Sequence, residues 1–468
     1  MEPTPKKNPM NMDTEAEIEP NQLLPDDLVL EIAARCGTIG DAIRCAATSK
    51  SLRRGILHAP FLRHLRGFLN NGGEHVDDGR PFMPTLLLGL YHQSGDPHLQ
   101  PSFVPAYSYS DGAKLPPSLA ALPSAPNRDD DDAGDGDSAC DFGPYLPVAS
   151  RRSLLVLRRR CKSTAREHLI ERHGLHPVEL SVCNPTTGER RVLPPHDVQD
   201  MSHALLDVDP IVAPSSFKLL VAELSNNNPR TLYVQIFSSD SEEGGGGWGP
   251  ALACPITSRF RESRFRFGCS DGNTGRPRPV VVGDTVYWLC TSRLRDRILM
   301  WRWRGDVARE ACIADPPPGY SLGRREHQCL AVLPSPADAA GAGSQSQALL
   351  GLIVIEAGEI EVWACEKSGA GSARDWKLWH RIQEETIPRR MDFSSRWLRG
   401  AELSWFCEGS GTLFLRPRDG TMSPLLFCLD TMEVSKLDAR EWELNPEPEF
   451  CPYEVDLLSH MLILMKQF

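Results

Sequence analysis

The sequence predicts an α+β multidomain protein in which a small three-helix module precedes a large all-β domain. Residues 23–68 are rich in Leu, Ile, Ala and Arg at helical spacing, whereas short β-type runs separated by Gly, Pro, Asn and Asp follow from about residue 80. Strand–turn–strand units recur in this second region about every 60 residues, which is typical of the blades of a β-propeller. The expected fold is therefore three helices followed by a propeller of about six blades.

Composition narrows the class of protein. The 468 residues include 51 basic and 62 acidic side chains, and the net charge of −11 argues against a nucleic-acid surface, because phosphate binding needs clustered cations. No run of about 18 apolar residues occurs, so no membrane span is expected. Residues 1–22 lack the apolar stretch of a signal peptide and are expected to be disordered. Fourteen cysteines without a Cys-x-x-Cys pair indicate reduced, mostly buried thiols and a location in the cytoplasm or the nucleus.

The first segment contains the signals of three short helices. Asp26 or Asp27 is expected to cap the first helix, Asp41 precedes the second, and Pro60 marks the end of the third. The apolar residues at helical spacing are Leu28, Ile32 and Cys36, then Ile43, Ala46 and Ala47, then Leu52, Ile56 and Leu57. Three helices in about 45 residues are too few to bury a large core, so the module is expected to complete itself against a partner.

The β region repeats a strand, a polar turn and a second strand. The units are Leu180–Val192, Leu232–Cys254, Ile298–Ile313, Glu361–Ile382 and Leu425–Leu437. Further strand pairs are expected before them at Val280–Val282 with Thr285–Cys290, Ala331–Leu333 with Leu349–Ile355, and Ala401–Cys407 with Thr412–Leu415. A sixth unit would combine Thr85–Tyr91 and Phe103–Tyr109 with residues after Tyr453. Four antiparallel strands per unit favour a propeller, and a large β-sandwich with irregular hairpins is the alternative.

These patterns divide the chain into three parts. They are a disordered lead at 1–22, the helical module at 23–68 and the β domain at 80–468. Insertions near 111–140, 240–247 and 337–347 contain too few apolar residues to offset their own ordering entropy, so they are expected to be disordered.

The helical segment also carries a specific motif. It opens with Leu-Pro-x-Asp-Leu at residues 24–28, places Ile32 four residues after Leu28, and continues through an Ala/Cys-rich second helix to a Ser-Lys-Ser-Leu-Arg stretch and a Pro-Phe-Leu close. This pattern resembles an F-box, the module through which F-box proteins bind a Skp-type adaptor and, through it, a cullin-based ubiquitin ligase. The resemblance covers about a tenth of the chain.

The F-box resemblance implies which residues contact the adaptor. They are Leu24, Pro25, Leu28, Ile32, Ile43, Leu52 and Ile56. The segment departs from the family at Ser49, where members often have Cys, and at Leu52, where they often have Trp. The missing aromatic ring is expected to weaken adaptor binding, because large rings dominate interface energetics. A self-contained amphipathic helical hairpin is the alternative reading of the segment.

The β domain carries a weaker resemblance. Cys183-Asn-Pro-Thr-Thr-Gly-Glu-Arg-Arg191, followed by Leu-Pro-Pro, is similar to a turn of plant F-box-associated, kelch-like regions, and Val-Val-Val-Gly-Asp-Thr-Val-Tyr-Trp-Leu at 280–289 fits the same picture. The arrangement most resembles the large grass F-box families that have a C-terminal domain of unknown function. We interpret the first motif as a structural turn, in which Asn184 starts the turn and Gly188 takes a positive φ.

Signals for catalysis or metal binding are weak. Gly-Cys-Ser-Asp-Gly at 268–272 matches a nucleophile elbow, but the residues after it predict a loop rather than a helix. The acidic run Asp129–Asp137 fails the EF-hand pattern, and His168, His173 and His176 lie between cysteines that lack close partners. No cofactor, metal or catalytic residue is therefore expected.

Paired arginines bracket one predicted strand. Arg151-Arg152 precede it and Arg158–Arg160 follow it, which indicates either a strand with solvated ends or a nuclear-import or acidic-partner patch.

The sequence thus predicts a non-catalytic substrate receptor of a Skp–cullin–F-box ubiquitin ligase. Its expected partners are the adaptor, through it a cullin, and an unidentified target protein, with no nucleic acid and no membrane. Two alternatives remain open at this point. One is a propeller-type hydrolase or sugar-binding protein with a helical cap, and the other is an F-box protein that works outside the ligase.

Overall fold

A computed structural model describes the helices, the strands and the shorter connections between them. The described residues are 25–35, 39–58, 60–62, 65, 82–92, 101–106, 119, 122, 145–160, 178–198, 202–206, 216–224, 230–240, 246–257, 265–267, 278–291, 295–304, 310–318, 327–334, 348–366, 375–388, 397–417, 423–437 and 450–465.

The helical module consists of α1 (Asp26–Arg35), α2 (Ile39–Thr48) and α3 (Lys50–Ile56). Ser49 caps α3, since its Oγ accepts a hydrogen bond from the Leu52 N–H at 3.1 Å. Asp41 lies in the first turn of α2 rather than before it. Pro60 does not end α3, because residues 60–62 are helical again. Proline suits such a start, since the first N–H groups of a helix have no intrahelical partner.

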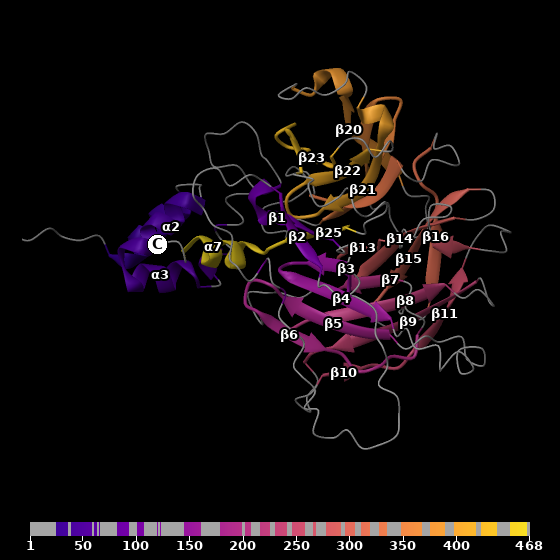
Figure 1. The fold of residues 1–468 in the computed structure, drawn as a ribbon, viewed down its shortest axis with the longest axis horizontal. Helices are drawn as coiled ribbons and strands as arrows, with labels where there is room; N and C mark the ends of the chain where they lie inside the picture. The colour runs from indigo at the N-terminus through magenta and orange to yellow at the C-terminus, as the bar shows by residue number, and fades with distance from the viewer. Residues whose placement is uncertain are drawn as a thin grey trace, which may run out of the picture.

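The helical module packs against α7 (Leu457–Met465), which lies near the other end of the chain. Leu457, Met461 and Met465 of α7 share one apolar cluster with Ala42, Ile43, Ala46 and Ile56 of α2 and α3. Figure 1 shows α7, in yellow, beside the indigo helices and between them and the sheets. The core of the helical module therefore includes residues distant in sequence.

One titratable group is buried at this junction. His460 of α7 is 7% exposed, and its Nδ1 has no hydrogen-bond partner among the described residues. Burial lowers the pKa of His460 to about 4. The folded protein therefore holds this imidazole neutral at pH values where the unfolded chain protonates it.

We expect the free energy of unfolding to fall as the pH drops from about 6.5 toward about 4. His460 contributes up to about 1.4 kcal/mol per pH unit to this fall, because only the unfolded chain binds the proton in that range. Urea unfolding at about pH 7 and about pH 5 should show a smaller pH-dependent loss for His460→Leu than for the unaltered protein. Replacing the exposed His58 in the same way is the control. An identical pH dependence with and without His460 would contradict this account.

The strands form several antiparallel sheets. One sheet joins β1 (Leu87–His92) and β2 (Ser102–Pro105) to β25 (Phe450–Glu454). The next is β3 (Leu146–Arg151), β4 (Leu154–Arg160), β5 (Val178–Asn184) and β6 (Glu189–Val192). Two further four-stranded sheets are β17 (Gln328–Leu333), β18 (Leu349–Glu356), β19 (Glu359–Glu366) and β20 (Asp375–Gln383), and β21 (Ala401–Cys407), β22 (Thr412–Pro417), β23 (Leu425–Cys428) and β24 (Val434–Lys436). Short 3₁₀ turns occur at Pro84–Leu86, Glu384–Thr386 and Leu398–Gly400.

The largest sheet contains two such units. The first is β7 (Ser202–Leu205), β8 (Lys218–Leu224), β9 (Thr231–Ser238) and β11 (Leu252–Thr257), with β10 (Gly247–Trp248) added to β9. The second is β13 (Val280–Val282), β14 (Thr285–Thr291), β15 (Asp296–Arg302) and β16 (Ala311–Ala314), with β12 (Arg266–Phe267) added to β14. Parallel pairing of β11 with β16 joins the two units. Between them, the indole N–H of Trp288 donates to Ser202 Oγ at 2.9 Å.

One strand from each of these units belongs to a closed ring. β25 contacts β3, and contacts then run from β3 to β7, β13, β17 and β21 before returning to β25. We call these six strands the inner ring. Figure 1 shows the sheets spreading outward from the region of β25, β3 and β13.

β25 closes the inner ring by pairing with a strand from the start of the β region. Its Cys451 lies opposite Tyr91 of β1, and the two strands run antiparallel. Ser153, in the turn between β3 and β4, fixes β25 from the other side. Its N–H donates to the Glu454 carbonyl at 2.9 Å, and its carbonyl accepts the Tyr453 hydroxyl at 3.0 Å.

The prediction of short helices followed by a mostly β region is confirmed. Every predicted strand pair from Leu180–Val192 to Leu425–Leu437 coincides with two antiparallel strands of one unit. The predicted turn after Cys183 is present, since Asn184 Oδ1 accepts the Thr186 N–H at 3.0 Å and Gly188 has a φ of 80°. The predicted unit that begins at Thr85–Tyr91 also forms, but its third strand is β25 at Phe450–Glu454, and the residues after Tyr453 that were expected to supply it lead instead into α7. The predicted insertions lie largely outside the described residues.

Candidate functional site

An exposed apolar face lies on α1. Leu28 is 51% exposed and Ile32 is 49% exposed, and their four-residue spacing places them on one side of the helix. Pro25, just before α1, is also exposed. Among the described residues, only Leu378 and Leu462 are other large hydrophobic side chains with comparable exposure. This face is therefore an unusual concentration of uncovered apolar surface.

The other residues implied by the F-box resemblance lie elsewhere. Ile43, Leu52 and Ile56 are buried by the chain itself, and Ile43 and Ile56 belong to the core shared with α7. A partner cannot touch Ile43 or Ile56 without opening that core, and Leu52 is only 7% exposed. Leu24 lies outside the described residues. The surface that α1 leaves available is thus formed by Pro25, Leu28 and Ile32.

A central cavity of about 220 Å³ lies within the inner ring, and each of its six strands contributes lining residues. The wall includes apolar side chains such as Val148, Val280, Val332 and Trp405. Three arginines and four acidic residues are also part of the lining, namely Arg151, Arg278, Arg416, Asp296, Glu402, Glu408 and Glu454. A concave site that combines apolar and charged side chains on a rigid scaffold is typical of ligand binding.

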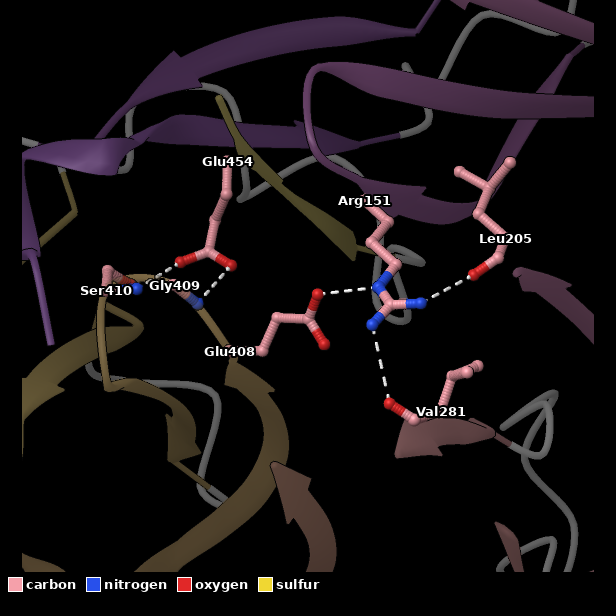
Figure 2. Close-up of polar contacts among 7 residues, drawn as sticks. All are labelled: Arg151, Leu205, Val281, Glu408, Gly409, Ser410 and Glu454. Carbon is pink, nitrogen blue, oxygen red and sulfur yellow. Dashed lines mark hydrogen bonds and ion pairs between the residues drawn. The ribbon is translucent and has the colours of Figure 1, made fainter. Parts of the chain in front are cut away.

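Arg151 crosses one part of the cavity and joins four segments (Figure 2). Its Nε donates to Glu408 Oε1 at 2.6 Å, while Nη1 and Nη2 donate to the carbonyls of Leu205 and Val281 at 3.1 and 3.4 Å. The Arg151 side chain is 14% exposed and that of Glu408 is 29% exposed. One guanidinium therefore connects β3 to β7, to β13 and to the turn after β21.

Glu454 lies beside this ion pair. Its carboxylate accepts the backbone N–H groups of Ser410 and Gly409 at 2.7 and 3.0 Å. Burial raises the pKa of Glu454 above its ordinary value, although these donors oppose the shift. The arrangement fixes the turn between β21 and β22 against β25.

A second polar group of the lining comes from other strands. Gln328 Nε2 donates to Asp296 Oδ2 at 3.0 Å. Arg416 donates to Ser404 Oγ at 2.8 Å and to Glu402 at 3.3 Å. The bond from Gln328 joins β17 to β15 of the neighbouring unit, whereas the bonds of Arg416 join β22 to β21 within one unit.

An aromatic ring and an arginine meet on the same wall. The Arg278 guanidinium lies 4.5 Å from the centre of the Trp405 ring, and both residues line the cavity. This is the geometry of a cation–π contact.

The cavity thiols are not activated. Burial raises the pKa of Cys329 to about 12 and that of Cys407 well above its ordinary value. A thiol is nucleophilic only as the thiolate, so Cys329 and Cys407 are not poised as nucleophiles. Among the described residues no two cysteines form a disulfide, and seven of the ten described cysteines are buried.

Three of the arginines that bracket the strand at 153–157 are not solvated strand ends. Arg151 binds across the cavity, Arg158 is 1% exposed, and Arg159 pairs with Glu179 at 2.8 Å. The sequence signal missed here is the short turn at Arg152 and Ser153, both of which have positive φ. That turn places Arg151 at the end of an inner strand, where its side chain reaches the cavity.

Several sequence motifs fall outside the described residues. They are the Gly-x-Ser-x-Gly segment at 268–272, the acidic run Asp129–Asp137, and His168, His173 and His176. Within the described ranges, no three His, Cys, Asp or Glu side chains gather closely enough to hold a metal ion. No helix in the described part of the chain has the length and apolarity needed to cross a membrane.

Comparisons with solved structures return distant likenesses. A DUF4784 family protein from Bacteroides caccae aligns at 9% identity and a TM-score of 0.34, over 78% of this chain and 73% of that one. A puromycin hydrolase aligns at 12% identity and a TM-score of 0.31, over 64% of this chain and 39% of the other. A putative dipeptidyl aminopeptidase IV from Bacteroides ovatus aligns at 10% identity and a TM-score of 0.24, over 65% and 42%. The chain thus spans about two fifths of the length of the latter two proteins.

Comparison with protein families gives a firmer result. No curated protein matches this chain. A family model described as a domain of unknown function, DUF7595, matches residues 137–468. This range contains every strand from β3 to β25 and α7, and it begins after the helical module. Because the match covers well over half of the chain, the protein belongs to the DUF7595 family.

Proposed function

We infer that this protein is a substrate-receptor subunit of a Skp–cullin–F-box ubiquitin ligase. The observation that carries the proposal is the exposed pair Leu28 and Ile32 on the first helix of the segment that resembles an F-box. Because each of these side chains is already about half covered, covering the rest contributes roughly 0.8–1.5 kcal/mol before the cost of association. α2 and α3 already pack on α7, so α1 can leave its apolar face exposed while the core of the helical module is complete.

The β region acts in this proposal as a six-bladed propeller that holds the target protein. Support comes from the closed contacts of the six inner-ring strands and from the three or four antiparallel strands of each unit. β25 closes the ring by joining strands from the start of the region, as closure of such an array requires.

The receptor needs no catalytic group of its own. Holding a target near the ubiquitin-charged enzyme raises the effective concentration of its lysines, and this proximity supplies the rate gain. α7 links the adaptor-binding helices to the inner ring, so the two binding functions keep a fixed relation.

Co-purification with a Skp-type adaptor tests the proposal. We expect Leu28→Asp to reduce adaptor recovery at least about tenfold, because a charge on this face opposes its burial. Leu378→Asp is the matched control, since Leu378 is an exposed leucine of β20, and it should leave recovery unchanged. Both variants should retain the melting temperature of the unaltered protein. Equal recovery with Leu28→Asp and Leu378→Asp would contradict the proposed contact.

Recovery of a cullin together with the adaptor separates a ligase receptor from a protein that uses the same contact outside the ligase. The receptor role requires both partners in one complex.

A further inference from the structure

One buried amide of the central cavity has an unused acceptor. Gln328 is 8% exposed, and its Nε2 donates to Asp296 Oδ2 at 3.0 Å. Its Oε1 has no hydrogen-bond partner among the described residues. The orientation of the amide is set by its neighbour, because a carboxylate accepts hydrogen bonds and would repel Oε1. Both residues line the cavity, so an acceptor and a carboxylate lie side by side in its wall.

The pair formed by Gln328 Oε1 and the Asp296 carboxylate is suited to a planar, positively charged hydrogen-bond donor. A buried acceptor without a donor is unfavourable, and such groups in native proteins are normally satisfied. A guanidinium presents parallel N–H groups in a fixed fork, which reaches two adjacent acceptors at once. The lining also contains four acidic residues against three arginines, so its charge favours a cation.

The rest of the cavity suits the stem of an arginine. The lining includes apolar side chains such as Leu330, Val280 and Val148, which can cover methylene groups. The Arg278 guanidinium already lies 4.5 Å from the centre of the Trp405 ring, so the ligand's guanidinium is assigned to Gln328 and Asp296 and not to this ring. The volume of about 220 Å³ is small, so it admits a side chain rather than a folded segment.

We propose that the central cavity binds an arginine side chain of the target protein, with the guanidinium on Gln328 Oε1 and Asp296 and the aliphatic stem along the apolar part of the lining. The assignment of the arginine to a target protein rests on the proposed receptor function. The binding chemistry does not, because it belongs to the cavity alone.

Calorimetric titration of the full chain with N-acetyl-arginine-N-methylamide tests the inference. The matched probe is the same compound built on citrulline, which keeps the shape and several donors but has no charge. We expect saturable binding of the arginine probe, at least about tenfold tighter than that of the citrulline probe. Absence of saturable binding, or equal binding of the two probes, would overturn the proposal. This comparison uses the unaltered protein and so does not depend on the folding of any variant.

Gln328→Met then locates the site. It removes the unused acceptor while keeping the size of the side chain, and it should weaken the arginine probe about tenfold or more. The control is Gln383→Met, because Gln383 donates to Glu359 at 3.3 Å in an equivalent amide–carboxylate pair on the surface of β20. Equal affinities in the two variants would place the probe elsewhere and overturn the assignment. Neither titration contains the adaptor, so loss of adaptor binding and loss of arginine binding are separate results.

Discussion

Replacing Arg151 with methionine is expected to lower the free energy of unfolding by about 3 kcal/mol. The substitution leaves the partly buried Glu408 carboxylate without its 2.6 Å partner and removes donors from the carbonyls of Leu205 and Val281. Removing one member of a buried ion pair is costly because the other charge stays out of water. Urea unfolding followed by circular dichroism measures the change.

A surface ion pair of the same length provides the control. Lys377 Nζ lies 2.6 Å from Glu366 Oε2, with side chains that are 65% and 48% exposed. Lys377→Met should cost less than about 1 kcal/mol, because solvent screens exposed pairs. If Arg151→Met costs no more than Lys377→Met, the cross-ring role of Arg151 is refuted.

Introducing aspartate at Met461 is expected to detach the helical module from the rest of the protein. Met461 has no exposed surface and packs among Ala42, Ile43 and Ile56. A buried unpaired carboxylate costs more than about 4 kcal/mol, which is a large part of the stability of an ordinary domain. Hydrogen exchange should show loss of amide protection in α2 and α3 while the sheets keep theirs.

The neighbouring residue is a built-in control. Leu462 is 37% exposed on the same helix, so Leu462→Asp should change stability by less than about 1 kcal/mol. Met461→Asp should also reduce adaptor recovery, because α1 loses the core that supports it. Persistence of full protection in α2 and α3 with Met461→Asp would show that the helices fold without α7.

The local part of the fold could be predicted from sequence. Strand pairs such as Leu425–Leu437 are joined by short turns, and turn residues act over a few positions, as Gly188 with its φ of 80° illustrates. The parallel pairing of β11 with β16 could not be foreseen, because it joins strands of different units. The packing of α7 on the helical module is equally non-local, and the residues after Tyr453 were expected to form part of a sixth β unit rather than a helix.

The candidate sites follow the same division. Leu28 and Ile32 could be identified because their spacing on one short helix is a local property. Ile43, Leu52 and Ile56 share that spacing, yet they are buried, and only the tertiary packing distinguishes the two groups. Gln328 and Asp296 gave no signal, since 32 positions separate them and neither lies in a motif.

The pairing of β1 with β25 has a consequence for synthesis on the ribosome. β1 ends at His92 and its partner begins at Phe450, so one edge of β1 has no native neighbour while more than 350 intervening residues are translated. An unpaired strand edge is a template for association with other chains. Nascent molecules of this protein should therefore depend on chaperones that shield β1 until β25 has been synthesised and can dock beside it.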